Sequence, residues 1–114
     1  MATPQVFELP ATVIPLAGGA TPKVAMGPYT SVSFQFNFDA DGGDAAGNVF
    51  LESSNDGVNF NKYPDSTLGF NNTTPSHLLE VRIYKTKYIR AVVEKTSGTG
   101  GTCSVLPYFT TNME

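Results

Sequence analysis

The clearest pattern in the chain is Ser31-Val32-Ser33-Phe34-Gln35-Phe36-Asn37-Phe38-Asp39. Apolar and polar side chains alternate over these nine residues. Successive side chains of a β-strand point to opposite faces, so strict alternation is typical of a strand with one face on a core and the other in water. We therefore predict a half-buried strand that follows Tyr29 and ends at Asp39.

Working outward from this strand, further segments have the composition of strands. They are Asn48–Ser54, Val58–Tyr63, Leu78–Lys85, Tyr88–Glu94 and Cys103–Thr110. Leu79, Val81 and Ile83 share one face of the third segment. Ile89, Ala91 and Val93 share one face of the fourth. Each of these two segments therefore has a face suited to a core.

Turn residues separate the predicted strands. Asp39–Gly47 is rich in glycine and acid and predicts a surface loop. Ser54-Asn55-Asp56-Gly57 predicts a hairpin turn, because asparagine, aspartate and glycine tolerate the backbone angles that it needs. The segment Ser97–Thr102 predicts a second hairpin loop. The loop Ser66–Ser76 offers Leu68 and Phe70 as anchors, and Pro107 marks an edge or a bulge.

No segment predicts a helix. Six or more short strands separated by turns predict an all-β protein, a single antiparallel β-sandwich of the jelly-roll or immunoglobulin-like kind. The order in which the strands pair cannot be predicted from these patterns.

The first 28 residues hold five of the eight prolines. Proline fixes φ and removes an amide donor, which excludes a helix. We predict an extended, proline-rich N-terminal arm (residues 1–28) in front of a β-sandwich domain (residues 29–114). The arm is apolar and needs a surface to lie on. Two alternatives stay open: a neighbouring subunit, or its own sandwich, to which it would add the first strand.

Composition narrows the class of partner. The 114 residues carry a formal charge of −3 with seven lysines and arginines, too few for a surface that binds nucleic acid through its phosphates. No stretch approaches the ~20 apolar residues of a membrane span, and the N-terminus lacks the pattern of a signal peptide. We expect a protein made in a cytoplasm, without a nucleic-acid or membrane partner.

Catalytic chemistry has few candidates in this sequence. His77 is the only histidine and no nucleophile motif accompanies it, so a loop histidine is the simplest interpretation. Cys103 is the only cysteine, which excludes an intrachain disulfide and predicts a small core residue. We expect no enzyme activity, no catalytic residue and no cofactor.

The sequence offers candidate residues for two kinds of binding site. Asp39, Asp41 and Asp44 could offer oxygens to calcium, but their spacing departs from that of an EF-hand loop, so a solvated acidic turn is simpler and we predict no metal site. Aromatic side chains could bind sugar rings. The chain has five tyrosines and no tryptophan, and Tyr84 and Tyr88 lie close together in sequence. Strand propensity also explains these tyrosines.

Two segments together resemble a known pattern. Phe50-Leu51-Glu52-Ser53-Ser54-Asn55-Asp56-Gly57-Val58-Asn59-Phe60 is a strand with a Ser-x-Asp-Gly-x-x-aromatic hairpin, and Lys87–Val93 contains an aromatic-Ile-Arg strand. The pattern is similar to that of discoidin-type galactose-binding-like jelly rolls. It is also similar to that of small tailed-bacteriophage virion proteins, which it matches over more of the chain. Physically, we expect Phe60 in the core and Arg90 paired with Glu52 or Glu80.

The second resemblance implies a non-enzymatic virion structural protein. Its expected role is that of a capsid decoration or cement protein, a homo-oligomer that binds the major capsid protein or other virion proteins and is located in the virion. A tail or fibre accessory is the neighbouring possibility, and a carbohydrate- or ligand-binding module is the alternative. The residues expected to contact other subunits are Val6, Phe7, Leu9, Val13, Ile14 and Leu16.

Overall fold

The structure is a computed structural model that describes residues 6–82 and 86–111, with the backbone alone at Val6. The described residues form eleven strands and no helix. The strands are β1 (Val6–Glu8), β2 (Thr12–Pro15), β3 (Gly19–Ala20), β4 (Val24–Ala25), β5 (Ser31–Asp39), β6 (Ala46–Ser54), β7 (Asn61–Lys62), β8 (Leu68–Phe70), β9 (Ser76–Arg82), β10 (Tyr88–Ser97) and β11 (Thr102–Thr110).

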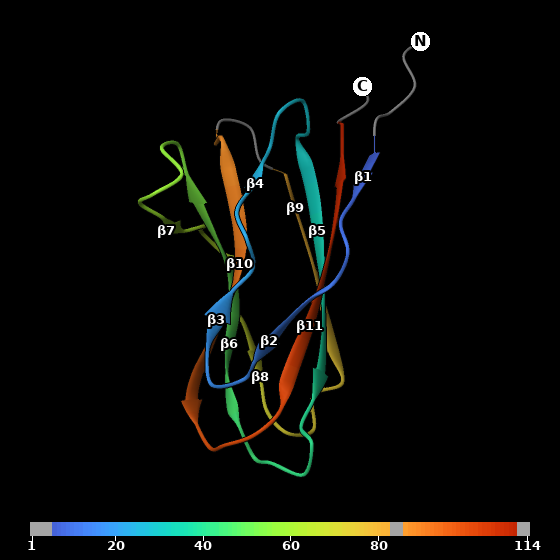
Figure 1. Cartoon of the computed structure of the whole chain (residues 1–114), viewed down its shortest axis with the longest axis vertical. Coiled ribbons are helices and arrows are strands. Elements are labelled where there is room, and N and C mark those ends of the chain that lie inside the picture. Colours follow the sequence, from blue (N-terminus) through green and yellow to red (C-terminus); the bar gives the residue numbers. More distant parts are fainter. Residues whose placement is uncertain (1–5, 83–85, 112–114) are drawn as a thin grey trace.

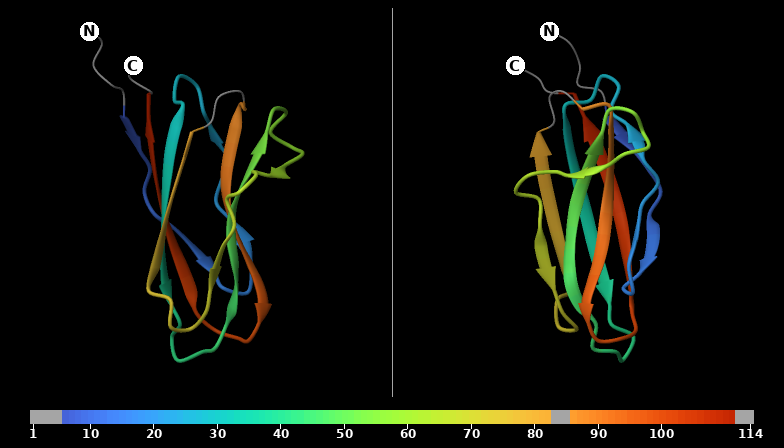
Figure 2. Two further views of the ribbon diagram at one scale, coloured as in Figure 1. Left: turned by 180° about the vertical axis from the view of Figure 1, so that it is seen from behind. Right: turned by 90° about the vertical axis from the view of Figure 1, so that its left-hand side faces the viewer.

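These strands make two antiparallel sheets packed face to face (Figures 1 and 2). Sheet A has the order β1-β11-β5-β9, and β2 also pairs with β11. Sheet B has the order β3-β10-β6-β7, with β4 on β10 and β8 on β6. The predicted all-β antiparallel sandwich is therefore confirmed. The described residues hold no helix that is long and apolar enough to cross a membrane.

The core lies between the sheets and follows the alternation of the sequence. Phe34 and Phe36 of β5 and Phe109 of β11 are fully buried, and Ile89, Ala91 and Val93 of β10 meet them from sheet B. Burial of each large apolar side chain contributes about 1.5–3 kcal/mol. The strand predicted from the first pattern is β5, and Phe70 is buried while Leu68 packs partly against the core. Ile83 lies outside the described residues.

Three sequence expectations differ from the structure. Ser97–Thr102 is not a hairpin loop, because β10 belongs to sheet B and β11 to sheet A, so this loop crosses the sandwich. It packs on the loop that joins β5 to β6: the Asp44 amide donates to the Thr99 carbonyl, and the Thr99 amide donates to Asp44 Oδ1, both at 3.0 Å. A hairpin loop and a loop that crosses between sheets use the same turn residues, so the local sequence does not distinguish the two kinds of loop.

The strand after the Asp-Gly turn is shorter than predicted. Of Val58–Tyr63, only Asn61–Lys62 forms a strand, because Asp56 Oδ1 accepts the amides of Val58 and Asn59 at 2.8 Å and extends the turn. Pro107 lies in an interior strand, because β11 pairs with β5 in an unshifted register. On its other side it lies beside the interval between β1 and β2, where no described strand pairs with β11, so it marks a local edge only.

Residues 6–28 lie on this sandwich. β1 and β2 pair with β11 in sheet A, and β3 and β4 pair with β10 in sheet B, so the segment passes from one sheet to the other (Figure 1). Ile14, Leu16 and Met26 belong to the core cluster. The described part of the predicted arm therefore supplies strands to its own sandwich, which is one of the two alternatives left open by the sequence.

Candidate functional site

The outer face of sheet A carries exposed apolar side chains. Core residues alternate with outward-facing ones along β11, so Leu106 and Tyr108 point away from the core and are each 40% exposed. Leu78 of β9 is 54% exposed and lies in the same row, because Gln35 of β5 pairs with both Leu78 and Leu106. Val13 of β2, 63% exposed, pairs with Ser104. We call Val13, Gln35, Leu78, Leu106 and Tyr108 the outer apolar face.

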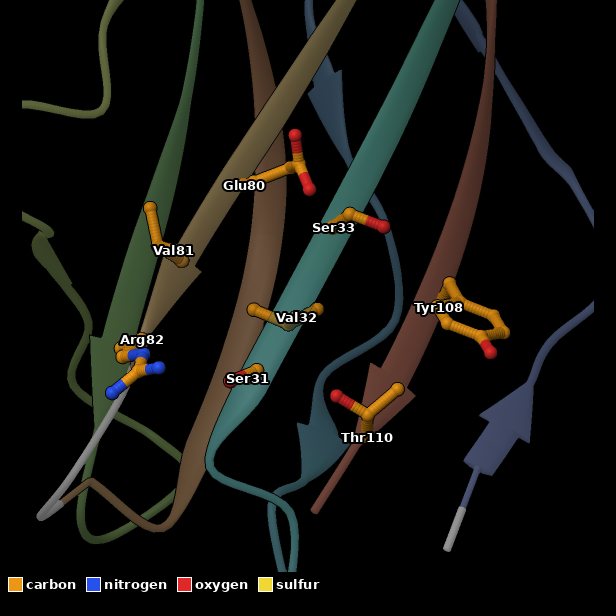
Figure 3. Close-up of a pocket in the computed structure, with 8 residues that line it drawn as sticks. All are labelled: Ser31, Val32, Ser33, Glu80, Val81, Arg82, Tyr108 and Thr110. Carbon is orange, nitrogen blue, oxygen red and sulfur yellow. The ribbon is translucent and has the colours of Figure 1, made fainter. Parts of the chain in front are cut away.

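Two adjoining hollows cross this face. One has a volume of about 300 Å³ and is lined by polar groups of β9, β5 and β11, among them Glu80, Ser33 and Thr110 (Figure 3). The other, of about 430 Å³, includes Leu78 and Leu106. Ser33 and Tyr108 line both hollows. The face is thus an apolar centre with hydroxyl and carboxylate groups at its border.

The outer face of sheet B is covered by its own chain instead. Phe50 of β6 is only 4% exposed, and Lys62 Nζ lies 4.3 Å from the centre of its ring. The Arg90 guanidinium lies 3.9 Å from the centre of the Phe60 ring, and its Nε donates to Glu52 Oε1 at 2.8 Å. Of the two predicted partners of Arg90, the structure places Glu52 beside it, whereas Glu80 lies on β9 of sheet A. Phe60 is outside the core, because it covers Arg90 on the outer face rather than lying beneath the turn.

The turn after β6 is rigid and polar. Asp56 accepts hydrogen bonds from the amides of Val58 and Asn59, from the Asn59 side chain and from the Ser54 hydroxyl. These bonds stabilise the carboxylate and lower the pKa of Asp56 far below its usual value, and the backbone N–H of Asn59 contributes most to this shift. A hollow of about 470 Å³ beside it is lined by residues whose side chains end in hydroxyl, amide or carboxylate groups.

The six predicted contact residues divide between core and surface. Ile14 and Leu16 are 3% and 2% exposed and face the core of their own chain. Phe7 is 38% exposed and stacks on Tyr29 at 5.8 Å, and Leu9 is half-buried. The side chain of Val6 lies outside the described residues, and Val13 belongs to the outer apolar face. A contact between the exposed members and another subunit stays a prediction.

The acidic loop does not gather its carboxylates. Asp39 Oδ1 accepts a hydrogen bond from the Asp41 amide at 2.9 Å, and Asp44 Oδ1 accepts one from the Thr99 amide at 3.0 Å. In the described residues, no group of three histidine, cysteine, aspartate or glutamate side chains is placed to hold a metal ion. These acids organise their own loops.

His77 and Cys103 have structural neighbours. His77 Nε2 lies 2.6 Å from the Gly69 carbonyl oxygen, and its ring meets the edge of Phe38 at 5.9 Å. Cys103 is fully buried, and loss of hydration raises the pKa of its thiol to about 12. The thiolate that would act as a nucleophile is therefore disfavoured near neutral pH.

The described tyrosines lie on different parts of the surface. Tyr63 donates to the Arg82 carbonyl oxygen at 2.8 Å, the ring of Tyr88 lies 5.3 Å from Lys23 Nζ, and Tyr29 packs against the core. Tyr84 lies outside the described residues, so the Tyr84–Tyr88 pair is not described. Tyr108 is the exposed tyrosine of the outer apolar face.

Sequence reasoning did not find the outer apolar face. Its signal was present in Leu78-Leu79 and in Val105-Leu106, since one residue of each adjacent apolar pair must point away from the core. The pattern alone does not tell whether a neighbouring side chain covers the outward member, as Lys62 of β7 covers Phe50 in sheet B.

Comparison with known proteins adds one result on the fold. The chain is similar to the crystal structure of SPBc2 prophage-derived protein YomS, with a TM-score of 0.63 and 10% sequence identity over 97% of each chain. At this identity the likeness shows a shared fold. The sequence matches no protein-family profile and no curated protein.

Proposed function

We propose that this chain is a non-enzymatic structural protein of a phage virion, a decoration or cement protein that binds the head through the outer apolar face. The observation that carries the proposal is this face, bare in a sandwich whose other outer face is covered by its own chain. The fold supports it, since 97% of this chain matches 97% of a prophage-derived protein in fold. The pattern shared with tailed-phage virion proteins points the same way.

The physical basis of such a role is added buried area. Stable protein interfaces bury about 1,200–2,000 Å² in total, and their energy is concentrated in a few central apolar and aromatic side chains. Tyr108 and Leu106 are placed to be these central residues, and Glu8, Glu80 and the serine hydroxyls of β5 form a polar rim. The partner is the major capsid protein or another virion protein that presents an apolar patch.

The test is co-sedimentation of the purified chain with heads of the encoding phage that were assembled without it. We expect binding that weakens at least about tenfold in Leu106→Lys, because the introduced charge must lose its water in the interface. The matched control is Val58→Lys, which changes an apolar residue that is 78% exposed and outside this face. Absence of binding, or equal binding by both variants, contradicts the proposal.

A second candidate function is a ligand-binding module for hydroxyl-rich molecules such as sugars. The observation that favours it is the polar hollow beside the Asp56 turn, lined also by Asn55, Asn59 and Asn61. Glycan-array binding that Asn59→Ala abolishes, together with absence of head binding, would establish it in place of the first. Asn59→Ala tests the side chain, while the backbone amide that caps Asp56 stays in place.

A further inference from the structure

β9 is unlike the other edge strands of the described chain. It pairs with β5 on one side through seven residues in an unshifted register, and no described strand pairs with its other side. The other strands at the sheet edges have between two and four residues. Proteins usually protect a long edge with proline, lysine or a bulge, because its amides and carbonyls can pair with another chain. Ser76–Arg82 contains no proline, lysine or bulge; its charged residues are Glu80 and Arg82, and among the described residues Tyr63 covers only the Arg82 end of its open side.

The register identifies which backbone groups face outward. The Phe38 amide donates to the Pro75 carbonyl oxygen, one step beyond the last pair of the ladder. Hydrogen-bonded and non-hydrogen-bonded pairs alternate in an antiparallel ladder, so the backbone groups of His77, Leu79 and Val81 point to β5. Those of Ser76, Leu78 and Glu80 point to the open side. The hydrogen bond from Tyr63 to the Arg82 carbonyl fits this parity, since it reaches Arg82 from the open side.

We propose that β9 pairs with β9 of a second copy of this chain, antiparallel and about a two-fold axis at Leu78. Leu78 then lies opposite Leu78 of the second copy, and Ser76 lies opposite its Glu80. The three pairs form about six hydrogen bonds, two for each pair, and use every outward-facing amide and carbonyl from Ser76 to Glu80. The two A sheets become one continuous sheet.

Charge and neighbouring contacts select this register. A two-fold axis at Glu80 would place the two Glu80 carboxylates opposite each other, and an axis at Leu79 would place them diagonally, within about 8 Å. An axis at Val81 would take the Arg82 carbonyl away from Tyr63. The axis at Leu78 separates the two Glu80 residues and joins two leucines that are each 54% exposed in the single chain.

This pairing also extends the outer apolar face. Leu78, Gln35 and Leu106 form one row across sheet A, so the axis at Leu78 joins two such rows into one stripe. The inference rests on the geometry of β9 and holds whether or not the chain binds a phage head. Head binding and self-pairing are therefore separately testable.

Disulfide trapping tests the register. Hydrogen-bonded partners in an antiparallel pair have Cα atoms about 5.5 Å apart, within the range that a disulfide bridges. Leu78→Cys is therefore expected to give a covalent dimer on mild oxidation. Glu80→Cys is the matched control on the same face of the same strand, and its two copies would be about 14 Å apart. The buried Cys103 does not compete.

Sedimentation of the uncrosslinked chain tests the dimer itself. We expect the full chain to form a dimer, and Leu78→Lys to raise the dimer dissociation constant at least about tenfold. The free energy of unfolding of the monomer should be unchanged, since the side chain is exposed in the single chain. A full chain that stays monomeric overturns the proposal. So does a dimer that Leu78→Lys leaves intact, or a Glu80→Cys disulfide that forms as readily as that of Leu78→Cys.

Discussion

Truncation of Leu16 to alanine tests whether the proline-rich N-terminal segment belongs to its own sandwich. Leu16 is 2% exposed in the core, and its amide donates to the Gly101 carbonyl at 3.0 Å. The substitution removes three carbon atoms, worth about 0.8 kcal/mol each, or about 2.4 kcal/mol together. The cavity left behind adds to this, and Leu→Ala changes in cores cost about 2–5 kcal/mol. We expect a loss of about 3–4 kcal/mol.

Val13→Ala is the matched control. It lies in the same N-terminal segment but points away from the core and is 63% exposed, so we expect a change within about 0.5 kcal/mol. Chemical denaturation, followed by circular dichroism at a protein concentration below the dimer dissociation constant, gives both free energies of unfolding. If Leu16→Ala is as harmless as Val13→Ala, the segment does not pack on its own sheet, and the reasoning that places it in the core is wrong.

Three other changes probe close packing, acid stability and thiol reactivity. Gly47→Ala should destabilise the fold by about 1–3 kcal/mol in denaturation, because an added Cβ would lie 2.0 Å from the Glu94 carbonyl oxygen. Asp56→Asn should make thermal stability fall less steeply as the pH is lowered below about 4. Because the pKa of Asp56 is lowered by folding, the carboxylate's contribution to folding stability is fully present above about pH 4 and is lost as the pH falls toward the folded pKa. Cys103 should react with a thiol reagent only after unfolding, because it is buried and its pKa is raised to about 12.

Each of these three has a result that contradicts it. Gly69→Ala is the control for Gly47, since its Cβ would meet atoms only at 3.8 Å, and equal losses would refute the packing argument. If thermal stability falls with pH in Asp56→Asn as steeply as in the unmodified chain, the turn amides do not stabilise the carboxylate in solution. Rapid labelling of Cys103 in the native protein would place the thiol at the surface.

Prediction from sequence succeeded where one strand has two different faces. The alternation from Val32 to Phe38 located β5, and Ile89, Ala91 and Val93 located the buried face of β10, because burial selects side chains with a period of two. Sequence reasoning left Arg90 two possible partners on an outer sheet face, Glu52 and Glu80, and the ion pair forms with Glu52 because β10 and β6 are neighbours in sheet B.

It failed where a contact between distant segments decides the outcome. The segment Ser97–Thr102 has the glycines of a hairpin, yet its partner is the loop at Asp44 on the other sheet. Phe60 is as apolar as any core residue, yet the Arg90 guanidinium offers its ring a partner outside the core. Leu106 is exposed because no described segment of the chain packs over the outer face of sheet A. A local sequence pattern contains no information on such packing.

The pairing of β11 with the strands near the start of the chain determines the order in which this protein can fold. β11 is an interior strand of sheet A, and its partners on one side are β1 and β2, as in the pair of Ile14 with Cys103. Almost the whole sequence must be held in a loop before that pair forms, and the entropy of closing it is lost before any contact compensates for it. Folding dominated by such distant pairings takes milliseconds to seconds. Until β11 is in place, β5 has only β9 beside it in sheet A, and the backbone groups along its other edge have no strand partner.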